Sequence, residues 1–172
     1  MRDFAPKLLA FEELPGGWFG IAMEYFTSAC RMAESPALVS HGEAWLKKMD
    51  EVVKMLHQHS YVHGDLRLPN FIVDGERLLL IDFDWGGQEG QATFPDIRLH
   101  PILRKGRGDM LIRKHHDEAV LEDAKELILR EIELQKLEER LMSIRGQQLE
   151  SRGFVKRTGK LEGYQLDVRG EE

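Results

Sequence analysis

Cysteine is almost absent from this sequence: Cys30 is the single one, so an internal disulfide is excluded. No apolar run is long enough to span a bilayer, and no charged-plus-apolar leader follows Met1. An excess of positive charge is also lacking: 30 acidic side chains outnumber 24 lysines and arginines, and the net charge of −6 argues against binding to nucleic acid or to anionic membranes. These absences predict a reduced, intracellular protein, cytoplasmic or nuclear, with no nucleic-acid and no membrane partner.

The length of 172 residues suits one domain and is short for two. Within it, residues 61–87 hold three side chains with evident chemistry, Asp65, Asn70 and Asp82. Phosphoryl transfer needs Mg²⁺ held by hard oxygen ligands and a carboxylate that accepts or orients the attacking hydroxyl. Aspartate and asparagine side chains supply such oxygens, so the three residues predict this chemistry if the fold brings them together.

A predicted hairpin brings them together. Residues 71–73 and 78–81 are short apolar strands around an Asp74-Gly75 turn signal. The ends of such a hairpin meet, which places Asp82 beside Asn70. One carboxylate and one amide oxygen can then share a cation, while Asp65 stays free as the general base.

Residues 63–70, His-Gly-Asp-Leu-Arg-Leu-Pro-Asn, resemble the catalytic loop of the protein-kinase-like superfamily, and the His-Gly-Asp form is similar to aminoglycoside- and choline-kinase-like members. Residues 81–83, Ile-Asp-Phe, match that superfamily's metal-binding Asp-Phe-Gly, with Asp84 in place of the glycine. Residues 81–87, followed by Phe94-Pro95, look most like a group of kinase-like proteins found in fungi. The resemblance covers residues 6–120.

The resemblance implies a role for each residue. Asp65 would be the catalytic base, Asn70 and Asp82 the Mg²⁺ ligands, and His63 the brace of the loop. Arg67 would offer positive charge to the transferring phosphate, with a solvent-exposed or ion-paired role as an equal alternative. The alternative for the whole set is a surface turn whose side chains only satisfy backbone groups.

Residues 7–14 and 18–26 are predicted strands, split by a Pro-Gly-Gly hairpin signal. The resemblance makes them the last strands of a kinase small lobe, leading into the hinge that binds adenine. Ordinary core packing and strand pairing are the alternative. The residues that this assignment places against ATP are Met23, Glu24 and Phe26.

The glycine-rich phosphate loop and the strand lysine of the superfamily do not occur ahead of Phe4. Because those parts clamp the phosphates, the resemblance implies a small lobe that is largely missing. The expectation is therefore either a truncated kinase or an inactive relic.

Residues 40–60 are predicted to form a helix that supports the catalytic loop, with Ser40 as N-cap and an apolar stripe at helical spacing. The stripe consists of Trp45, Met49, Val52, Val53 and Leu56. The end of this helix carries His57 and His59, with His63 nearby. A structural role is the preferred interpretation of the three histidines, and a zinc site the weaker alternative.

Residues 85–114 correspond to the activation segment, without the Ala-Pro-Glu that ends it in many protein kinases. A solvated loop is preferred over a phosphate or acidic-substrate contact for the basic residues here. They are Arg98, Arg104, Lys105, Arg107, Arg113 and Lys114. His115-His116-Asp117 suggests a metal site, but Asp117 is better explained as the N-cap of the following helix.

Residues 118–146 are predicted to be a long amphipathic helix ending before Gly146. Its apolar seam, residues 120–144, suits self-packing and a coiled-coil partner or homo-oligomer equally. Residues 147–172 lack periodicity and are predicted to be a flexible tail.

The sequence therefore predicts an α+β fold: a mainly helical protein-kinase-like large lobe, with a remnant small-lobe hairpin, a catalytic-loop hairpin and a long C-terminal helix. The predicted domains are 1–117 (small-lobe and hinge remnant 1–30, large lobe 31–117), 118–146 and 147–172. The expected function is ATP- and Mg²⁺-dependent phosphoryl transfer to a hydroxyl, protein Ser/Thr favoured. The alternatives are a pseudokinase binding or scaffold module and a small-molecule kinase.

Overall fold

The computed structural model of the chain describes residues 3–95, 101–104 and 109–151. It divides into two compact units, Met1–Lys136 and Leu137–Glu172. The first unit contains every strand described and the candidate site. Some sequence expectations lie outside the described residues, namely those for Arg98, Lys105, Arg107 and the tail beyond residue 151.

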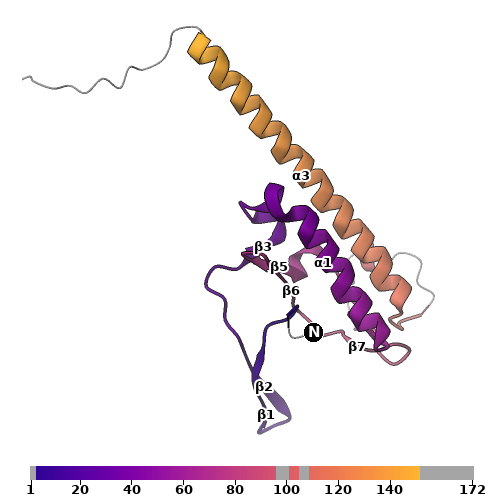
Figure 1. The fold of residues 1–172 in the computed structure, drawn as a ribbon. Coiled ribbons are helices and arrows are strands. Elements are labelled where there is room, and N and C mark those ends of the chain that lie inside the picture. The colour runs from indigo at the N-terminus through magenta and orange to yellow at the C-terminus, as the bar shows by residue number, and fades with distance from the viewer. Residues whose placement is uncertain (1–2, 96–100, 105–108, 152–172) are drawn as a thin grey trace, which may run out of the picture. The chain divides into compact units, whose positions relative to one another are not determined.

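Two helices form the frame of the first unit. Helix α1 (Leu38–Gln58) and the first part of α3 (Lys114–Ser151) lie side by side and antiparallel (Figure 1). Asp50 of α1 binds Lys125 of α3 at 2.9 Å. The backbone of Gly42 approaches Ile132 so closely that an added Cβ would lie 2.5 Å from the isoleucine Cδ1. The expected stripe on α1 is confirmed, since Trp45, Met49, Val52, Val53 and Leu56 are all buried.

The predicted start of α1 is wrong by two residues. Ser40 is not the N-cap, because it already lies within the helix, where its hydroxyl donates to the carbonyl of Ala37, the residue before the first helical one. The chain turns earlier: Ser35 Oγ accepts from the amide of Ala37, and the Ser35 carbonyl accepts from Leu38. The helix ends at Gln58, and Ser60 reverses the chain with a φ of 59°.

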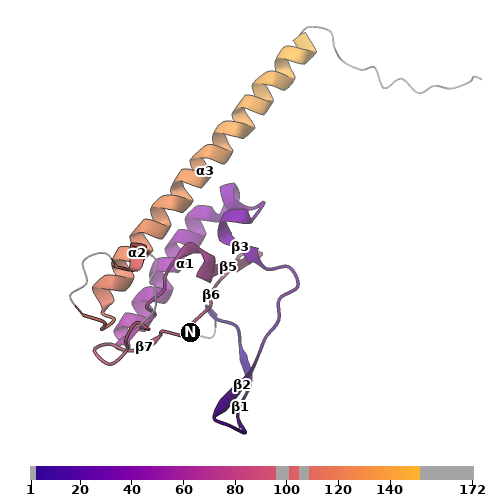
Figure 2. The same ribbon diagram turned by 180° about the vertical axis from the view of Figure 1, so that it is seen from behind.

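A three-stranded sheet lies next to α1, with the order β3-β5-β6 (Figure 2). Its strands are β3 (Cys30–Arg31), β5 (Phe71–Asp74) and β6 (Arg77–Leu80). β5 and β6 form the predicted hairpin, with Phe71 opposite Leu80 and Gly75 in the turn at a φ of 59°. The side chains of this hairpin that face the helices are buried: Phe71, Val73, Leu78 and Leu80. Two short strands, β4 (Tyr61–Val62) and β7 (Gly87–Gln88), pair with each other antiparallel. In the sequence, they bracket the residues 63–86.

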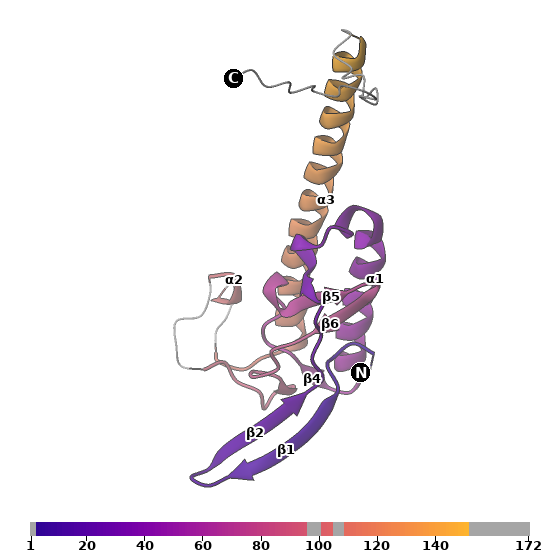
Figure 3. The same cartoon turned by 90° about the vertical axis from the view of Figure 1, so that its left-hand side faces the viewer.

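The predicted N-terminal hairpin is also present. β1 (Leu8–Leu14) and β2 (Trp18–Met23) form a long two-stranded ribbon (Figure 3), and Gly16 and Gly17 in its turn both have positive φ. Its base is tied to the three-stranded sheet by Arg77, whose guanidinium lies 3.7 Å from Glu24.

Helix α3 is longer than predicted at both ends. It begins at Lys114, three residues before Asp117, and continues through Gly146 to Ser151, because one glycine costs an exposed helix only about 1 kcal/mol. Val120, Ala124, Ile128 and Ile132 are buried, whereas the other apolar residues of the predicted seam are exposed: Leu127, Leu134, Leu137, Leu141 and Ile144. A short helix, α2 (Pro101–Arg104), precedes it. In the described part of the chain, no helix has the length and apolarity needed to cross a membrane.

Candidate active site

The loop that follows β4 is held from below by a carboxylate of α3. Asp117, only 1% exposed, accepts hydrogen bonds from the backbone N–H of His63 to Oδ2 and of Gly64 to Oδ1, both at 2.8 Å. His57 Nε2 lies 3.3 Å from the same Oδ2. The prediction of Asp117 as an N-cap is therefore wrong, because its carboxylate satisfies backbone donors more than 50 residues away rather than those of its own helix.

Gly64 has a packing reason to be glycine. Its φ is 84°, and an added Cβ would lie 2.8 Å from Ile112 Cδ1 and 3.2 Å from Trp85 Cβ. Both the backbone conformation and the space around it exclude a side chain.

His63 joins the loop to the end of β6. It is fully buried, its Nε2 lies 3.1 Å from the carbonyl of Ile81, and its Nδ1 accepts from the backbone N–H of Asp65 at 3.2 Å. Its ring is tilted against Phe83, with centroids 4.8 Å apart. Burial lowers the pKa of His63, against opposing effects of Asp117 and other acceptors. The neutral imidazole with its proton on Nε2 satisfies both contacts.

Asn70 closes the loop. Its side-chain Nδ2 donates to the carbonyl of Asp65 at 2.8 Å, and its own backbone carbonyl accepts from the amide of Ile81 at 3.0 Å. The amide nitrogen is thus used for the loop, which leaves Oδ1 as the atom with which Asn70 can meet a cation.

Asp82 directly follows Ile81, whose amide donates to the carbonyl of Asn70. The hairpin therefore returns the chain to Asn70, as predicted from the sequence. Asp82 is exposed. Its negative charge partly opposes the lowering of the His63 pKa by burial, and it contributes to the raised pKa of Arg67. Its φ of 64° is rare for a residue other than glycine. Backbone strain of this kind is concentrated at functional sites.

Asp65 is not free, contrary to the expectation from the sequence. It is 4% exposed, and both its oxygens accept from Arg67: Nε to Oδ1 at 2.5 Å and Nη2 to Oδ2 at 2.6 Å. This hydrogen bonding raises the pKa of Arg67. The ion-paired alternative for Arg67 is therefore the one seen in the structure, because a two-residue spacing lets the guanidinium fork meet the carboxylate.

The three residues expected to contact adenine lie at the base of the N-terminal hairpin. Met23 is 56% exposed and pairs with Leu8. The Glu24 amide donates to the carbonyl of Lys7, and the Lys7 amide donates to Glu24 Oε2. The ring centroid of Phe26 lies 5.0 Å from the guanidinium carbon of Arg77. Their role beside adenine stays a prediction.

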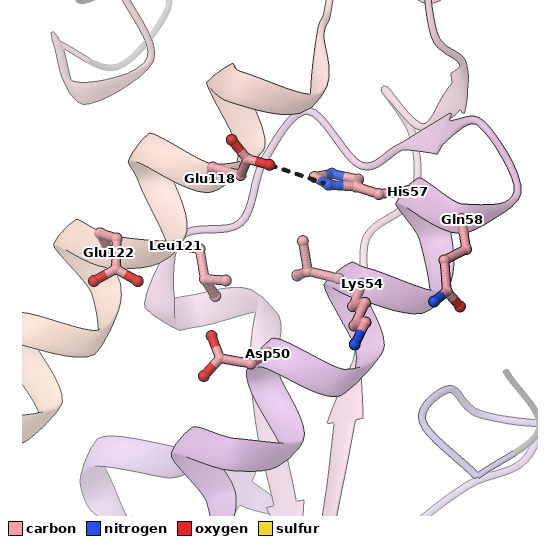
Figure 4. A pocket seen from close by; sticks show the side chains of 8 residues that line it. Asp50, Lys54, His57, Gln58, Glu118, Leu121 and Glu122 are labelled. Atoms are coloured by element: carbon pink, nitrogen blue, oxygen red, sulfur yellow. Dashed lines mark ion pairs between the residues drawn. The ribbon is translucent and has the colours of Figure 1, made fainter.

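Several hollows are lined by residues in the part of the chain that the structure describes. An apolar one of about 510 Å³ lies beside Phe83, Tyr61 and Met55. A smaller one of about 210 Å³ lies between Arg67, Ile102 and the α3 face at Val120 and Ala124. The third, about 430 Å³, lies between α1 and α3 and contains none of the expected site residues (Figure 4). It is lined by Asp50, Val53, Lys54, His57, Gln58, Glu118, Leu121 and Glu122.

Among the residues that the structure describes, no three histidine, cysteine, aspartate or glutamate side chains are arranged to hold a metal. The histidines expected as a weak zinc alternative have separate partners: His57 lies near Asp117 and Glu118, and His59 near the carbonyl of Met55. A cation at the site would depend on amide as well as carboxylate oxygen, as at Asn70 and Asp82.

The fold described above was compared with known proteins. No protein-family model and no curated protein matches this sequence. Among solved structures, the Cydia pomonella granulovirus kinase PK-1 is similar, with a TM-score of 0.52 and 17% sequence identity over 74% of this chain. The likeness shows a protein-kinase-like fold, and this chain spans about half the length of that kinase, 51%.

Proposed function

We propose that this chain is a protein-kinase-like phosphotransferase lobe that binds ATP with Mg²⁺ and transfers the γ-phosphate to a hydroxyl. The observation that carries the proposal is the junction of the 63–70 loop with the β5–β6 hairpin. His63 and the Asn70 carbonyl both hydrogen-bond to Ile81, the residue before Asp82, and this contact supports a site shared by Asn70, Asp82 and Asp65.

The donor set fits magnesium. Asn70 Oδ1 and the Asp82 carboxylate are hard oxygen ligands, and Mg²⁺ in nucleotide sites takes one or two such protein ligands, with phosphate and water completing its shell. When bound, the ion supplies charge neutralisation for the phosphates. The neutral His63 holds these two ligands at a fixed separation by bracing both sides of the junction.

Asp65 would act as the base once Arg67 releases it. While Arg67 is paired with it, both carboxylate oxygens of Asp65 accept hydrogen bonds from the guanidinium and are turned away from an acceptor hydroxyl. A nucleotide phosphate competes for the same guanidinium, since arginine binds phosphate with the same planar fork. Arrival of the nucleotide thus frees Asp65 and places the charge of Arg67 on the transferring group.

The hollow beside Arg67 is the natural place for the acceptor. It is lined by apolar side chains, including Leu68, Ile102 and Val120. An acceptor with its hydroxyl on a small apolar stem, such as a serine or threonine of a protein, fits about 210 Å³ better than a large polar sugar. Protein Ser/Thr is therefore the favoured acceptor over an aminoglycoside.

A second candidate is a pseudokinase, a nucleotide- or protein-binding module without turnover. The observation that favours it is the same Arg67–Asp65 pair: if phosphate does not displace it, the base stays blocked.

The test is transfer of a radiolabelled γ-phosphate to generic protein acceptors in the presence of Mg²⁺, comparing the natural chain with Asp65→Asn. The matched control is Asp50→Asn, an exposed aspartate on α1 away from the loop. Incorporation that disappears in Asp65→Asn and persists in the control supports the enzyme. Nucleotide binding without incorporation supports the pseudokinase. Absence of nucleotide binding overturns the enzyme and the nucleotide-binding form of the pseudokinase.

A further inference from the structure

His57, in the last turn of α1, lies between two carboxylates of α3. Its Nε2 is 3.3 Å from Asp117 Oδ2, and its Nδ1 is 3.7 Å from Glu118 Oε1 (Figure 4). The side chains of His57 and Asp117 are both largely buried, whereas that of Glu118 is exposed. The contact with Asp117 is therefore the stronger of the two, because water screens an exposed ion pair.

The main partner of His57 is the carboxylate that holds the 63–70 loop. Asp117 Oδ2 accepts from the backbone N–H of His63 and also faces His57, while Oδ1 accepts from the backbone N–H of Gly64. A rotation of the Asp117 side chain away from the loop would therefore break its contact with His57 as well.

We infer that His57 is a positioning residue for the 63–70 loop and that it acts through Asp117 in a proton-dependent way. Both ring nitrogens face carboxylate oxygens. A neutral imidazole has one N–H, whereas the doubly protonated ring donates from both nitrogens. A charge-assisted hydrogen bond is roughly twice as strong as a neutral one. Protonation of His57 thus tightens the hold of Asp117 on the loop, and loss of the proton as the pH rises relaxes it.

Other charged groups also face His57. Among them are residues that line the same hollow between α1 and α3: Asp50, Lys54, Glu118 and Glu122. Glu89, which follows β7, is within electrostatic range of His57, although its lowered pKa is due first to a hydrogen bond from the Lys114 backbone. Carboxylates and lysines ordinarily keep their charge between about pH 6 and 8, whereas histidine changes its charge there. A pH dependence of the loop in this range therefore points to a histidine.

Hydrogen exchange of the His63 and Gly64 amides in the full chain, followed by NMR between about pH 6 and 8 and expressed as protection factors, tests the inference. In the natural chain, the protection of both amides should fall about fivefold as the pH rises across this range. His57→Gln keeps one neutral donor, so its protection should stay near the high-pH value at every pH. His57→Phe keeps a ring without a donor and should lose a further factor of about five.

His59→Gln is the matched control, because His59 lies two residues further along the chain and contacts the carbonyl of Met55. This variant should leave both the protection and its pH dependence unchanged. Equal protection of the two amides in the natural chain and in His57→Phe overturns the inference. So does a pH dependence that persists in His57→Gln, since another group would then carry it.

The consequence for phosphoryl transfer rests on the function proposed above. His57→Gln leaves the expected metal ligands Asn70 and Asp82 in place, so it should flatten the dependence of kcat on pH and leave the KM for ATP nearly unchanged. The exchange measurement needs no nucleotide. A natural chain that transfers no phosphate would therefore overturn the proposed function, while the exchange of the two amides would still decide the role of His57.

Discussion

Removal of the Asp117 carboxylate should loosen the 63–70 loop. Asp117→Ala removes the acceptor of two backbone N–H groups, those of His63 and Gly64, and leaves both buried. A hydrogen bond to a charged group contributes roughly 1.5–3 kcal/mol, so the variant should lose about 3–5 kcal/mol of unfolding free energy. That is a large part of the 5–15 kcal/mol typical of a domain.

The assay is chemical denaturation, together with hydrogen exchange of the His63 and Gly64 amides. Glu118→Ala is the matched control: it is the next residue, its side chain is 64% exposed, and it lies 3.7 Å from His57. The control should lose less than about 1 kcal/mol and keep both amides protected. Asp117→Asn should fall between the two, because its amide keeps one acceptor and turns a donor toward the other N–H. A loss below about 1 kcal/mol in Asp117→Ala, or equal losses in both alanine variants, would refute the reasoning.

Three further outcomes follow from the same region. Burial lowers the folded-state pKa of His63, so the unfolded chain binds a proton first as the pH falls below about 6.5. The free energy of unfolding should therefore drop by up to about 1.4 kcal/mol per pH unit in that range. Urea titrations at several pH values should show a smaller dependence of the unfolding free energy on pH for His63→Gln. Asp82→Gly removes the side chain at a φ of 64° and should raise the unfolding free energy by up to about 1 kcal/mol while abolishing Mg²⁺-dependent nucleotide binding. Ser60→Gly, at a φ of 59°, should also raise the unfolding free energy but leave nucleotide binding intact. Equal nucleotide binding in both variants would count against a role for Asp82. Gly64→Ala should cost roughly 2–4 kcal/mol in thermal unfolding, since it meets both strain and the Ile112 side chain, and a neutral effect would show that the loop can shift.

The local features of the site were predictable from the sequence. The Asp74-Gly75 turn and the apolar runs around it specify the β5–β6 hairpin, and that hairpin alone determines that Asp82 returns to Asn70. The apolar stripe on α1 was equally predictable, because the three- and four-residue spacing of its apolar side chains lies within one short stretch of sequence.

Long-range contacts were not predictable in the same way. Asp117 satisfied every local rule for an N-cap, and its true partners are 53 and 54 residues away. One signal was present: Asp117 precedes Val120 and Leu121 on the buried face of α3, and a carboxylate on an apolar face requires buried donors. For Arg67 the sequence left an ion pair and a phosphate contact as equal alternatives, because a motif gives residue types and spacing, while the pair with Asp65 depends on the side-chain conformation.

The measurement that tests the phosphotransferase account most directly is calorimetric titration of the full chain with a non-hydrolysable ATP analogue, with and without Mg²⁺. The account predicts binding that depends on Mg²⁺ and that weakens by about tenfold or more, about 1.4 kcal/mol, in Asp82→Asn but not in Asp50→Asn. Binding of equal strength with and without Mg²⁺, or an Asp82→Asn variant that binds as well as the natural chain, would contradict it.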